Sequence, residues 1–458
     1  MLGTTFVVIL ALSAGWYFLL RRRAMAAAGP RLADLHSRPS YHGFYAALGS
    51  FLAGTAVLLV VGIGWGLWND MQLQNQIGQA LPESSAIERQ LVLSDAKAVA
   101  DGALPSRSGE LRSAVAERHA TLETARQWGT AALALAAALA FGLLAWRRSD
   151  RDFRARNRTE RMVTIVLWAT AAIAVLTTLG IVLSLIFETA NFFSNIGWRI
   201  DKFLFGTTWS PLSGVQSGQM NPDKVGAVPL FAGTFLITLI AMIVAVPIGL
   251  MAAIYLADFA SPRTRSVVKP MLEILAGIPT VVYGFFAAIT VAPFIRQSGE
   301  ALGISVASES ALAAGVVMGI MIIPFISSLS DDVINAVPQS LRDGSYGLGA
   351  TKAETIRQVV LPSALPGIVS AVLLGVSRAV GETMIVVMAA GQGANLTLNP
   401  LEAVTTVTVQ IVMLITGDTE ASTAAGPAFT LGFTLFCITL LMNIIALRIV
   451  RRYRELYD

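Results

Sequence analysis

A succession of long apolar stretches constrains this chain more than any other feature. Nine of them are long enough, or nearly long enough, to cross a bilayer as helices, near residues 3–20, 44–68, 128–146, 162–187, 229–256, 268–294, 309–330, 364–390 and 428–450. About 20 apolar residues in a helix span the roughly 30 Å of hydrocarbon. The composition, with 55% hydrophobic and 14% charged residues, excludes a soluble globular protein of 458 residues. We therefore predict an all-α integral membrane protein with about nine transmembrane helices.

Basic residues are distributed unevenly around these stretches. Arg21, Arg22 and Arg23 follow the first stretch, no basic residue precedes it, and arginines are dense at 147–161 and 451–454. Because basic residues concentrate on the cytoplasmic side of membrane proteins, this pattern predicts an N-terminus outside and a C-terminus inside. The first stretch is then a retained anchor and not a signal peptide. The same bias accounts for the net charge of +4, so we predict no nucleic-acid partner.

Two segments outside the apolar stretches have helical patterns. Residues 69–127 carry mixed charges with helical periodicity, which predicts an extracytoplasmic helical hairpin or short coiled pair. No chemistry-bearing cluster stands out there, so a solvated spacer is favoured over a docking module. Residues 400–416 are apolar but hold Glu402 and Gln410. We predict an interfacial helix on the outer face, since a tenth span would place the C-terminal arginines outside.

Two ionisable residues, Arg378 and Glu382, lie well inside the stretch 364–390. An ionised side chain at the centre of a bilayer costs at least about 2.5–3.5 kcal/mol, so such residues are candidates for a functional site. In a continuous helix, residues four positions apart share one face, so the two side chains are expected to meet. They belong either to a substrate pathway or to a structural ion pair that locks the span against a neighbouring helix.

The polar segment 331–363 has more local structure signals than a simple connector needs. Thr351 and Glu354 form a capping box for the residues that follow. We expect two short helices that meet at Gly349, and Pro362 is expected to stop the second helix before the next span. These signals suit a surface that docks into a partner, but a capping box also occurs by chance in ordinary loops.

In this segment the chain resembles the EAA loop of ABC importer permeases, the element that sits in a groove on the ATPase subunit. The matching residues are Asp343, Gly344, Ser345, Gly349, Ala350, Leu361 and Pro362. Three flanking runs are similar to the C-type permease subunit of the bacterial high-affinity phosphate importer: GTFLITLIAMIVAVPIGLMAAIYLADFAS (233–261), LEILAGIPTVVYGFF (272–286) and RAVGETM (378–384). One departure is that Asp343-Gly344-Ser345 replaces the usual Glu-Ala-Ala, and a glycine weakens a helix by about 1 kcal/mol relative to Ala.

The resemblance covers about residues 160–458 and carries several expectations. It implies a six-span type I ABC-importer permease domain at 161–458, with 331–363 as its cytoplasmic coupling loop. Residues 1–160 are then an N-terminal extension with three spans. The implied function is translocation of inorganic phosphate received from an extracytoplasmic phosphate-binding protein. The other expected partners are a second, homologous permease in a heterodimer, an ATPase subunit dimer and the lipid bilayer.

No catalytic residue, metal site or cofactor is predicted on this chain itself. The sequence lacks the G-x-x-x-x-G-K-[ST] phosphate cradle, and its histidines show no paired-ligand spacing for a metal. We therefore expect a transport subunit that is not an enzyme, with ATP used by the partner ATPase subunit.

An oxyanion permease would use the charged residues of the stretch 364–390 in a specific way. Arg378 supplies a permanent charge and a planar fork of donors that matches phosphate oxygens. Glu382 orients or partly neutralises the guanidinium, and Thr383 adds a hydroxyl. Sulfate and molybdate are the competing substrates. An ion-coupled secondary transporter and a non-transporting scaffold or sensor also remain open.

Overall fold

The computed structural model describes residues 2–28, 35–82, 86–100, 110–213, 220–417 and 421–454. Within these ranges the regular secondary structure is helical, and an isolated bridge joins Trp209 to Val225. Nine helices in the described part of the chain are long and apolar enough to cross a membrane. The predicted all-α fold with about nine transmembrane helices is therefore confirmed. The chain divides into two compact units, residues 1–176 and 177–458, which we call unit 1 and unit 2.

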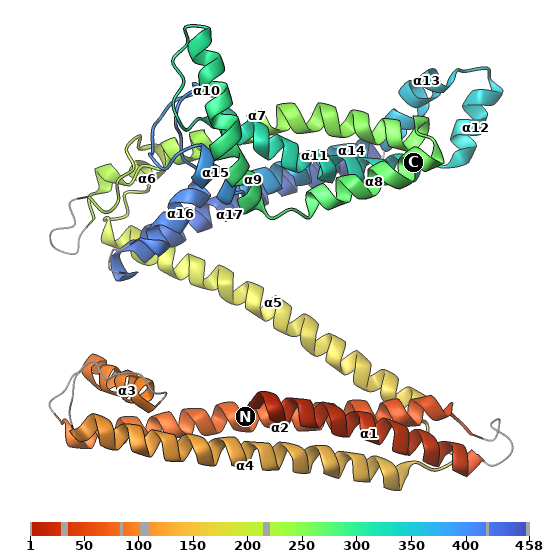
Figure 1. Ribbon diagram of the computed structural model, residues 1–458, viewed down its shortest axis with the longest axis vertical. Helices are drawn as coiled ribbons and strands as arrows, with labels where there is room; N and C mark the ends of the chain where they lie inside the picture. Colours follow the sequence, from red (N-terminus) through yellow and green to blue (C-terminus); the bar gives the residue numbers. More distant parts are fainter. Residues whose placement is uncertain are drawn as a thin grey trace. The chain divides into compact units, whose positions relative to one another are not determined.

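Unit 1 contains long helices that pack along one another and a short helix (Figure 1). Its helices are α1 (Leu2–Ala28), α2 (Pro39–Ala80), α3 (Ala86–Ala100), α4 (Glu110–Arg148) and the first part of α5 (Ala155–Asn195). Small residues let the backbones approach, because a Cβ on Gly49 of α2 would overlap the Phe141 ring of α4. Contacts of this kind drive helix association in membranes, where the hydrophobic effect between helices is absent.

The predicted helical segment 69–127 is helical at 69–80, 86–100 and 110–127, and its residues 83–85 and 101–109 lie outside the described part. The two ends of the segment are continuations of α2 and α4, and α3 packs on both. Leu73, Leu93 and Val115 are buried together, one from each of these helices. The segment therefore has an apolar core of its own.

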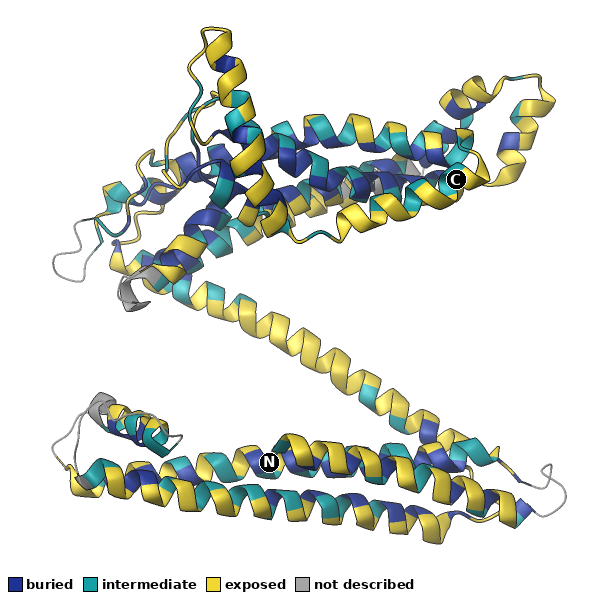
Figure 2. Cartoon of the chain, in the orientation of Figure 1, coloured by how far each residue is buried: buried dark blue, intermediate teal, exposed yellow. Residues whose placement is uncertain are grey.

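Unit 2 is organised around α7 (Val228–Ile254) and α11 (Ala311–Asn335), whose facing residues form an extensive buried apolar cluster. Figure 2 shows α11 with most of its surface buried. A Cβ on Gly319 of α11 would overlap Val244 of α7, so the two backbones lie close. This tight pair is the frame to which the other helices of unit 2 attach.

The remaining elements of unit 2 are shorter or lie around this frame (Figure 1). The helices are α6 (Ile200–Phe205), α8 (Pro262–Ala276), α9 (Thr280–Phe286), α10 (Ala292–Ala301), α12 (Gln339–Gly347), α13 (Lys352–Thr355), α14 (Leu361–Val380), α15 (Met384–Ala389), α16 (Val407–Thr416) and α17 (Ala421–Arg454). Turns of π-helix lie at Tyr255–Phe259, Ala287–Val291 and Ile356–Val360, and a 3₁₀ turn lies at Pro222–Lys224.

The stretch 268–294 was predicted as one span, and this is wrong. Helix α8 and the membrane-length helix Thr280–Ala301 are separate, with Pro279 between them. Proline lacks a backbone N–H and disfavours helical backbone in the residue before it, so the helix ends there. The break makes α8 an independent helix that can present its basic residues to α11.

The stretch 364–390 was also predicted as one span, and the chain breaks between α14 and α15. The predicted interfacial helix at 400–416 is α16, which has ten residues. At 1.5 Å per residue it is about 15 Å long and too short to cross a bilayer. One face of α16 is buried through Val407 and Gln410, and the indole Nε1 of Trp209 donates to Gln410 Oε1 over 3.0 Å. The helix is therefore packed into the bundle on that face.

Candidate functional site

The loop between α11 and α14 folds into the two short helices that its sequence predicts. Helix α12 ends near Gly349, whose φ of 86° lies in the left-handed region that favours glycine. Helix α13 begins at the predicted capping box, because Thr351 Oγ1 accepts from the Glu354 amide and the Glu354 side chain accepts from the Thr351 amide. The two helices thus meet at Gly349, as expected.

Pro362 does not stop the second helix, and this prediction is wrong. Helix α13 passes through the π-helical turn Ile356–Val360 directly into α14, so one continuous helix runs from Lys352 to Val380. A π-helical turn shifts the hydrogen-bond register by one residue. It therefore accommodates the missing backbone N–H of Pro362 without ending the helix. The loop and the membrane span therefore share one helix.

Helix α12 is held to the bundle by Arg342, which is buried. The guanidinium pairs with the buried carboxylate of Asp258, in the π-helical turn that follows α7, and donates to the Ile334 carbonyl of α11 over 2.8 Å. The hydroxyls of Ser345 and Thr355 are 2.9 Å apart and join α12 to α13. These contacts tie α12 to the π-helical turn after α7, to the end of α11 and to α13.

The outer surface of this loop is apolar and uncovered by the described residues of the chain. Leu341 and Tyr346 are exposed, and Leu348 is 91% exposed. Asp343 is exposed beside them, where its carboxylate accepts from the side-chain Nε2 of Gln339 over 3.0 Å. An exposed apolar rim on a well-anchored short helix suits insertion into a partner.

Two glycines of this loop provide a matched test of its geometry. A Cβ would meet no atom within 4 Å at Gly344 or at Gly349, but only Gly349 has a positive φ. We expect Gly344→Ala to stabilise the full chain by about 0.5–1 kcal/mol, because alanine suits a helix interior, and Gly349→Ala to destabilise it by about 1 kcal/mol. Thermal unfolding of the two purified variants measures both effects. Shifts of the same sign would contradict this account.

Arg378, on α14, directs its guanidinium to the middle of α11. The Nη2 atom lies 3.5 Å from Met321 Sδ, and the guanidinium carbon lies 5.9 Å from the centre of the Phe325 ring. Met321 and Phe325 are central in α11, which is long enough to span a membrane. Among the described residues no carboxylate forms an ion pair with Arg378. An unpaired cation thus lies near the midplane of the bundle.

The expected pairing of Glu382 with Arg378 on one helix face is wrong. Helix α14 ends at Val380, so the two residues are not on a continuous helix. Glu382 Oε1 instead accepts from the amides of Met384 (3.0 Å) and Ile385 (3.4 Å), which start α15. The carboxylate therefore supplies acceptors for free amides at a helix start, the usual place for an acidic side chain.

Thr383 occupies the N-cap position of α15, beside this carboxylate. Its hydroxyl lies 3.5 Å from the Gly381 carbonyl, a long contact. The Thr408 hydroxyl donates to the Glu382 carbonyl over 2.9 Å and ties the start of α16 to the break. Arg378, Glu382 and Thr383 thus lie around one interruption of the helix, which the sequence reasoning placed inside a continuous span.

Sequence reasoning also missed a buried carboxylate, Asp331, that joins α8 to α11. Asp331 is 1% exposed and accepts from Arg265 (3.0 Å), Lys269 (2.8 Å) and Asn335 (2.8 Å). The hydrogen bond to Asp331 raises the pKa of the Lys269 ammonium, against the opposing effect of burial. The signals available in the sequence were the acidic pair Asp331-Asp332, which follows the apolar stretch 309–330, and the basic residues Arg265 and Lys269, near the start of the stretch 268–294.

These features together define a class of protein: an all-helical membrane protein with a short, anchored helix whose exposed side is apolar. Two family models match the chain. Residues 245–455 match "Binding-protein-dependent transport system inner membrane component", and residues 6–177 match "Phosphate ATP-binding cassette transporter". The chain is therefore a multi-pass protein of the inner membrane and a permease subunit, not itself an enzyme.

Individual relatives narrow the class. The phosphate transport system permease protein PstC of Mesorhizobium japonicum is 32% identical over 65% of this chain and 93% of the relative. The probable ABC transporter permease protein YqgH of Bacillus subtilis is 35% identical over 52% of this chain and 74% of the relative. The chain belongs to the PstC family of phosphate transport system permeases. A solved methionine ABC transporter, MetNI, is 22% identical over 50% of this chain and 94% of its own, with a TM-score of 0.36.

Proposed function

We propose that this chain is the subunit through which inorganic phosphate crosses the membrane in an ATP-driven importer, after delivery by an extracytoplasmic binding protein. The family supports phosphate as the substrate, since relatives at this level of identity are phosphate permeases. The observation that carries the proposal is the Arg378 guanidinium beside Met321, near the midplane, without a carboxylate partner among the described residues. A cation without a counter-ion inside a membrane span is costly unless an anion visits it.

Arg378 is the residue proposed to meet the phosphate. Its fork of donors binds two oxygens of an oxyanion at once, and its charge persists at every physiological pH. Glu382 and Thr383 shape the helix interruption beside it. Glu382 is occupied by backbone amides, so its part is to hold the break open and not to neutralise the guanidinium.

Helix α12 is proposed as the element that docks into a groove on a dimer of ATPase subunits, which would use the ATP. Movement of α12 would reach the bundle through the Arg342–Asp258 pair and through the helix that starts at Lys352. From Lys352 to Arg378 that helix covers about 39 Å at 1.5 Å per residue. A rigid connection of this length links the docking surface to the proposed anion site.

The N-terminus is proposed to lie outside and the C-terminus inside, with a second permease packed on α5. With the N-terminus outside and the C-terminus inside, seven crossings place α12 in the cytoplasm, where an ATPase can reach it. The most apolar part of α5 has none of its residues buried within this chain. A second, homologous permease in a heterodimer would supply a surface for it.

Reconstitution tests this function directly. The full chain is incorporated into proteoliposomes with candidate permease, ATPase and binding-protein partners, and ATP hydrolysis is measured with binding protein loaded with phosphate, sulfate or molybdate. We expect stimulation by the phosphate-loaded protein alone, with ATP-dependent uptake of labelled phosphate. Stimulation by sulfate or molybdate would reassign the substrate, and uptake driven by a proton or sodium gradient without ATP would show a secondary transporter.

A further inference from the structure

A polar cavity lies in unit 1, and none of its lining residues is used by the proposed function. Its volume is about 370 Å³, and its lining residues come from α2, α3 and α4.

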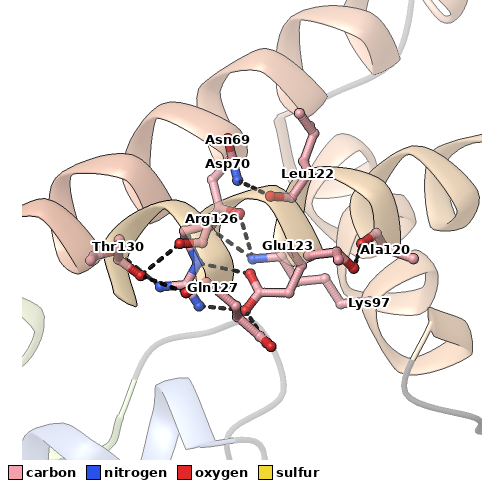
Figure 3. Close-up of polar contacts among 11 residues, drawn as sticks. Asn69, Asp70, Lys97, Ala120, Leu122, Glu123, Arg126, Gln127 and Thr130 are labelled. Atoms are coloured by element: carbon pink, nitrogen blue, oxygen red, sulfur yellow. Dashed lines mark hydrogen bonds and ion pairs between the residues drawn. The ribbon is translucent and has the colours of Figure 1, made fainter. Parts of the chain in front are cut away.

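 Figure 3 shows the polar side chains gathered there, with Asn69 and Asp70 from α2, Lys97 from α3, and Glu123 and Arg126 from α4.

The charges around this cavity balance one another. Lys97 Nζ lies 2.7 Å from Asp70 Oδ1, and Arg126 Nε donates to Glu123 Oε2 over 2.8 Å. Arg126 also donates to the Gly62 carbonyl over 3.0 Å, so its fork is largely occupied. A lone anion or a lone cation gains little net attraction from two such pairs. A ligand that carries both signs matches them better.

Some hydrogen-bonding capacity in the cavity is unused. Lys97 has three donor protons. Its side chain is 36% exposed, and the side chain of Asp70 is 39% exposed. Asn69 is 5% exposed, and its Oδ1 has no hydrogen-bond donor among the described residues. A buried acceptor without a donor is costly, so a ligand that brings N–H groups would be stabilised here.

The lining of the cavity has the mixed apolar and charged character expected at a membrane–water interface. Ile63, Gly66, Leu67 and Asp70 have the spacing of one helix face, and this face changes from apolar to charged along α2. Ile63 and Leu67 are exposed, and so is Trp128 of α4. Tryptophan is enriched where hydrocarbon meets headgroups. The lining therefore suits an amphiphile, with an apolar part along Ile63 and Leu67 and a polar part at Asp70.

We propose that this cavity binds a phospholipid whose headgroup carries a phosphodiester and a primary ammonium, the chemistry of phosphatidylethanolamine. The ammonium donates to Asp70 and Asn69 Oδ1, the phosphodiester accepts from Lys97, and the acyl chains follow Ile63 and Leu67. Because Lys97 is on α3, the bound lipid would fasten α3 to α2. The proposal does not depend on the transported substrate.

Lipid binding to the purified full chain tests the proposal. After removal of co-purified lipid, native mass spectrometry follows titration with phosphatidylethanolamine, phosphatidylcholine and phosphatidylglycerol of identical acyl chains, and with inorganic phosphate. Phosphatidylcholine has the same charges but no N–H donors. We expect phosphatidylethanolamine to bind at least about tenfold more tightly than the other two lipids. Equal binding of all lipids, preference for phosphatidylglycerol, or binding of free phosphate alone would overturn it.

Two variants place the lipid in this cavity. Gly62 is buried, lines the cavity, and has no atom within 4 Å of an added Cβ, so Gly62→Leu fills the space. Lys97→Gln removes the phosphodiester contact at a partly exposed position that folding tolerates. Each should weaken phosphatidylethanolamine binding at least about tenfold. The control Arg156→Gln breaks an exposed pair with Glu160 and should leave binding unchanged. Unchanged binding in Lys97→Gln would overturn the assignment even if Gly62→Leu fails to fold.

Discussion

Arg378→Ala is expected to lower phosphate uptake by the reconstituted importer at least about a hundredfold. A bidentate guanidinium contributes two charge-assisted hydrogen bonds of about 1.5–3 kcal/mol each, and 1.4 kcal/mol is a factor of ten. The side chain has no carboxylate partner among the described residues, so its removal leaves no buried acid uncompensated. Uptake of labelled phosphate into proteoliposomes measures the loss, and co-purification of the partner subunits shows whether assembly is intact.

Two further variants separate a role in the phosphate pathway from a general effect of charge. Arg378→Lys keeps the charge but loses the planar fork, so uptake should fall to an intermediate level. Arg296→Ala removes an exposed arginine that pairs with Glu300 on α10, and uptake should stay within about twofold because exposed pairs contribute little. Normal uptake by Arg378→Ala in an assembled complex would contradict the proposed anion site.

The number of spans was predictable because the bilayer imposes a strict rule on the backbone. Every amide and carbonyl in hydrocarbon must be paired within the protein, so long apolar stretches become helices whatever surrounds them. The interruption between Arg378 and Glu382 was not predictable in this way. A single Gly381 in an apolar run weakens a helix by only about 1 kcal/mol and does not decide whether it ends. The break is held by Thr408, which is distant in sequence.

The loop between α11 and α14 likewise combines features that the local sequence predicts with features that it does not. The capping box at Thr351 and the left-handed Gly349 follow from residues a few positions apart, and both were visible in the sequence. The continuation of the helix past Pro362 depends on a π-helical turn that no local pattern announced. The partner of Arg342 is Asp258, 84 positions away, and single-sequence reasoning has no means to pair them.

The second large effect is expected from Asp258→Ala. It leaves the Arg342 guanidinium buried without its carboxylate, and breaking a buried pair in this way costs about 3–5 kcal/mol. Both side chains are nearly inaccessible, at 10% exposed for Arg342 and 8% for Asp258, so solvent does not screen the loss. We expect a lower thermal stability of the full chain. In the reconstituted importer, ATP hydrolysis should continue while phosphate uptake falls.

The double variant Asp258→Leu with Arg342→Met decides whether the pair acts through its charge or through the contact itself. Apolar residues of similar volume often replace a buried ion pair without loss, so thermal stability should return to about the starting value. If the pair serves only to hold α12 against α7, coupled uptake should return as well. Asp223→Ala, which breaks an exposed pair with Lys202, is the matched control and should leave thermal stability nearly unchanged. Full coupling in Asp258→Ala would show that movement of α12 reaches the bundle through the Lys352–Val380 helix alone.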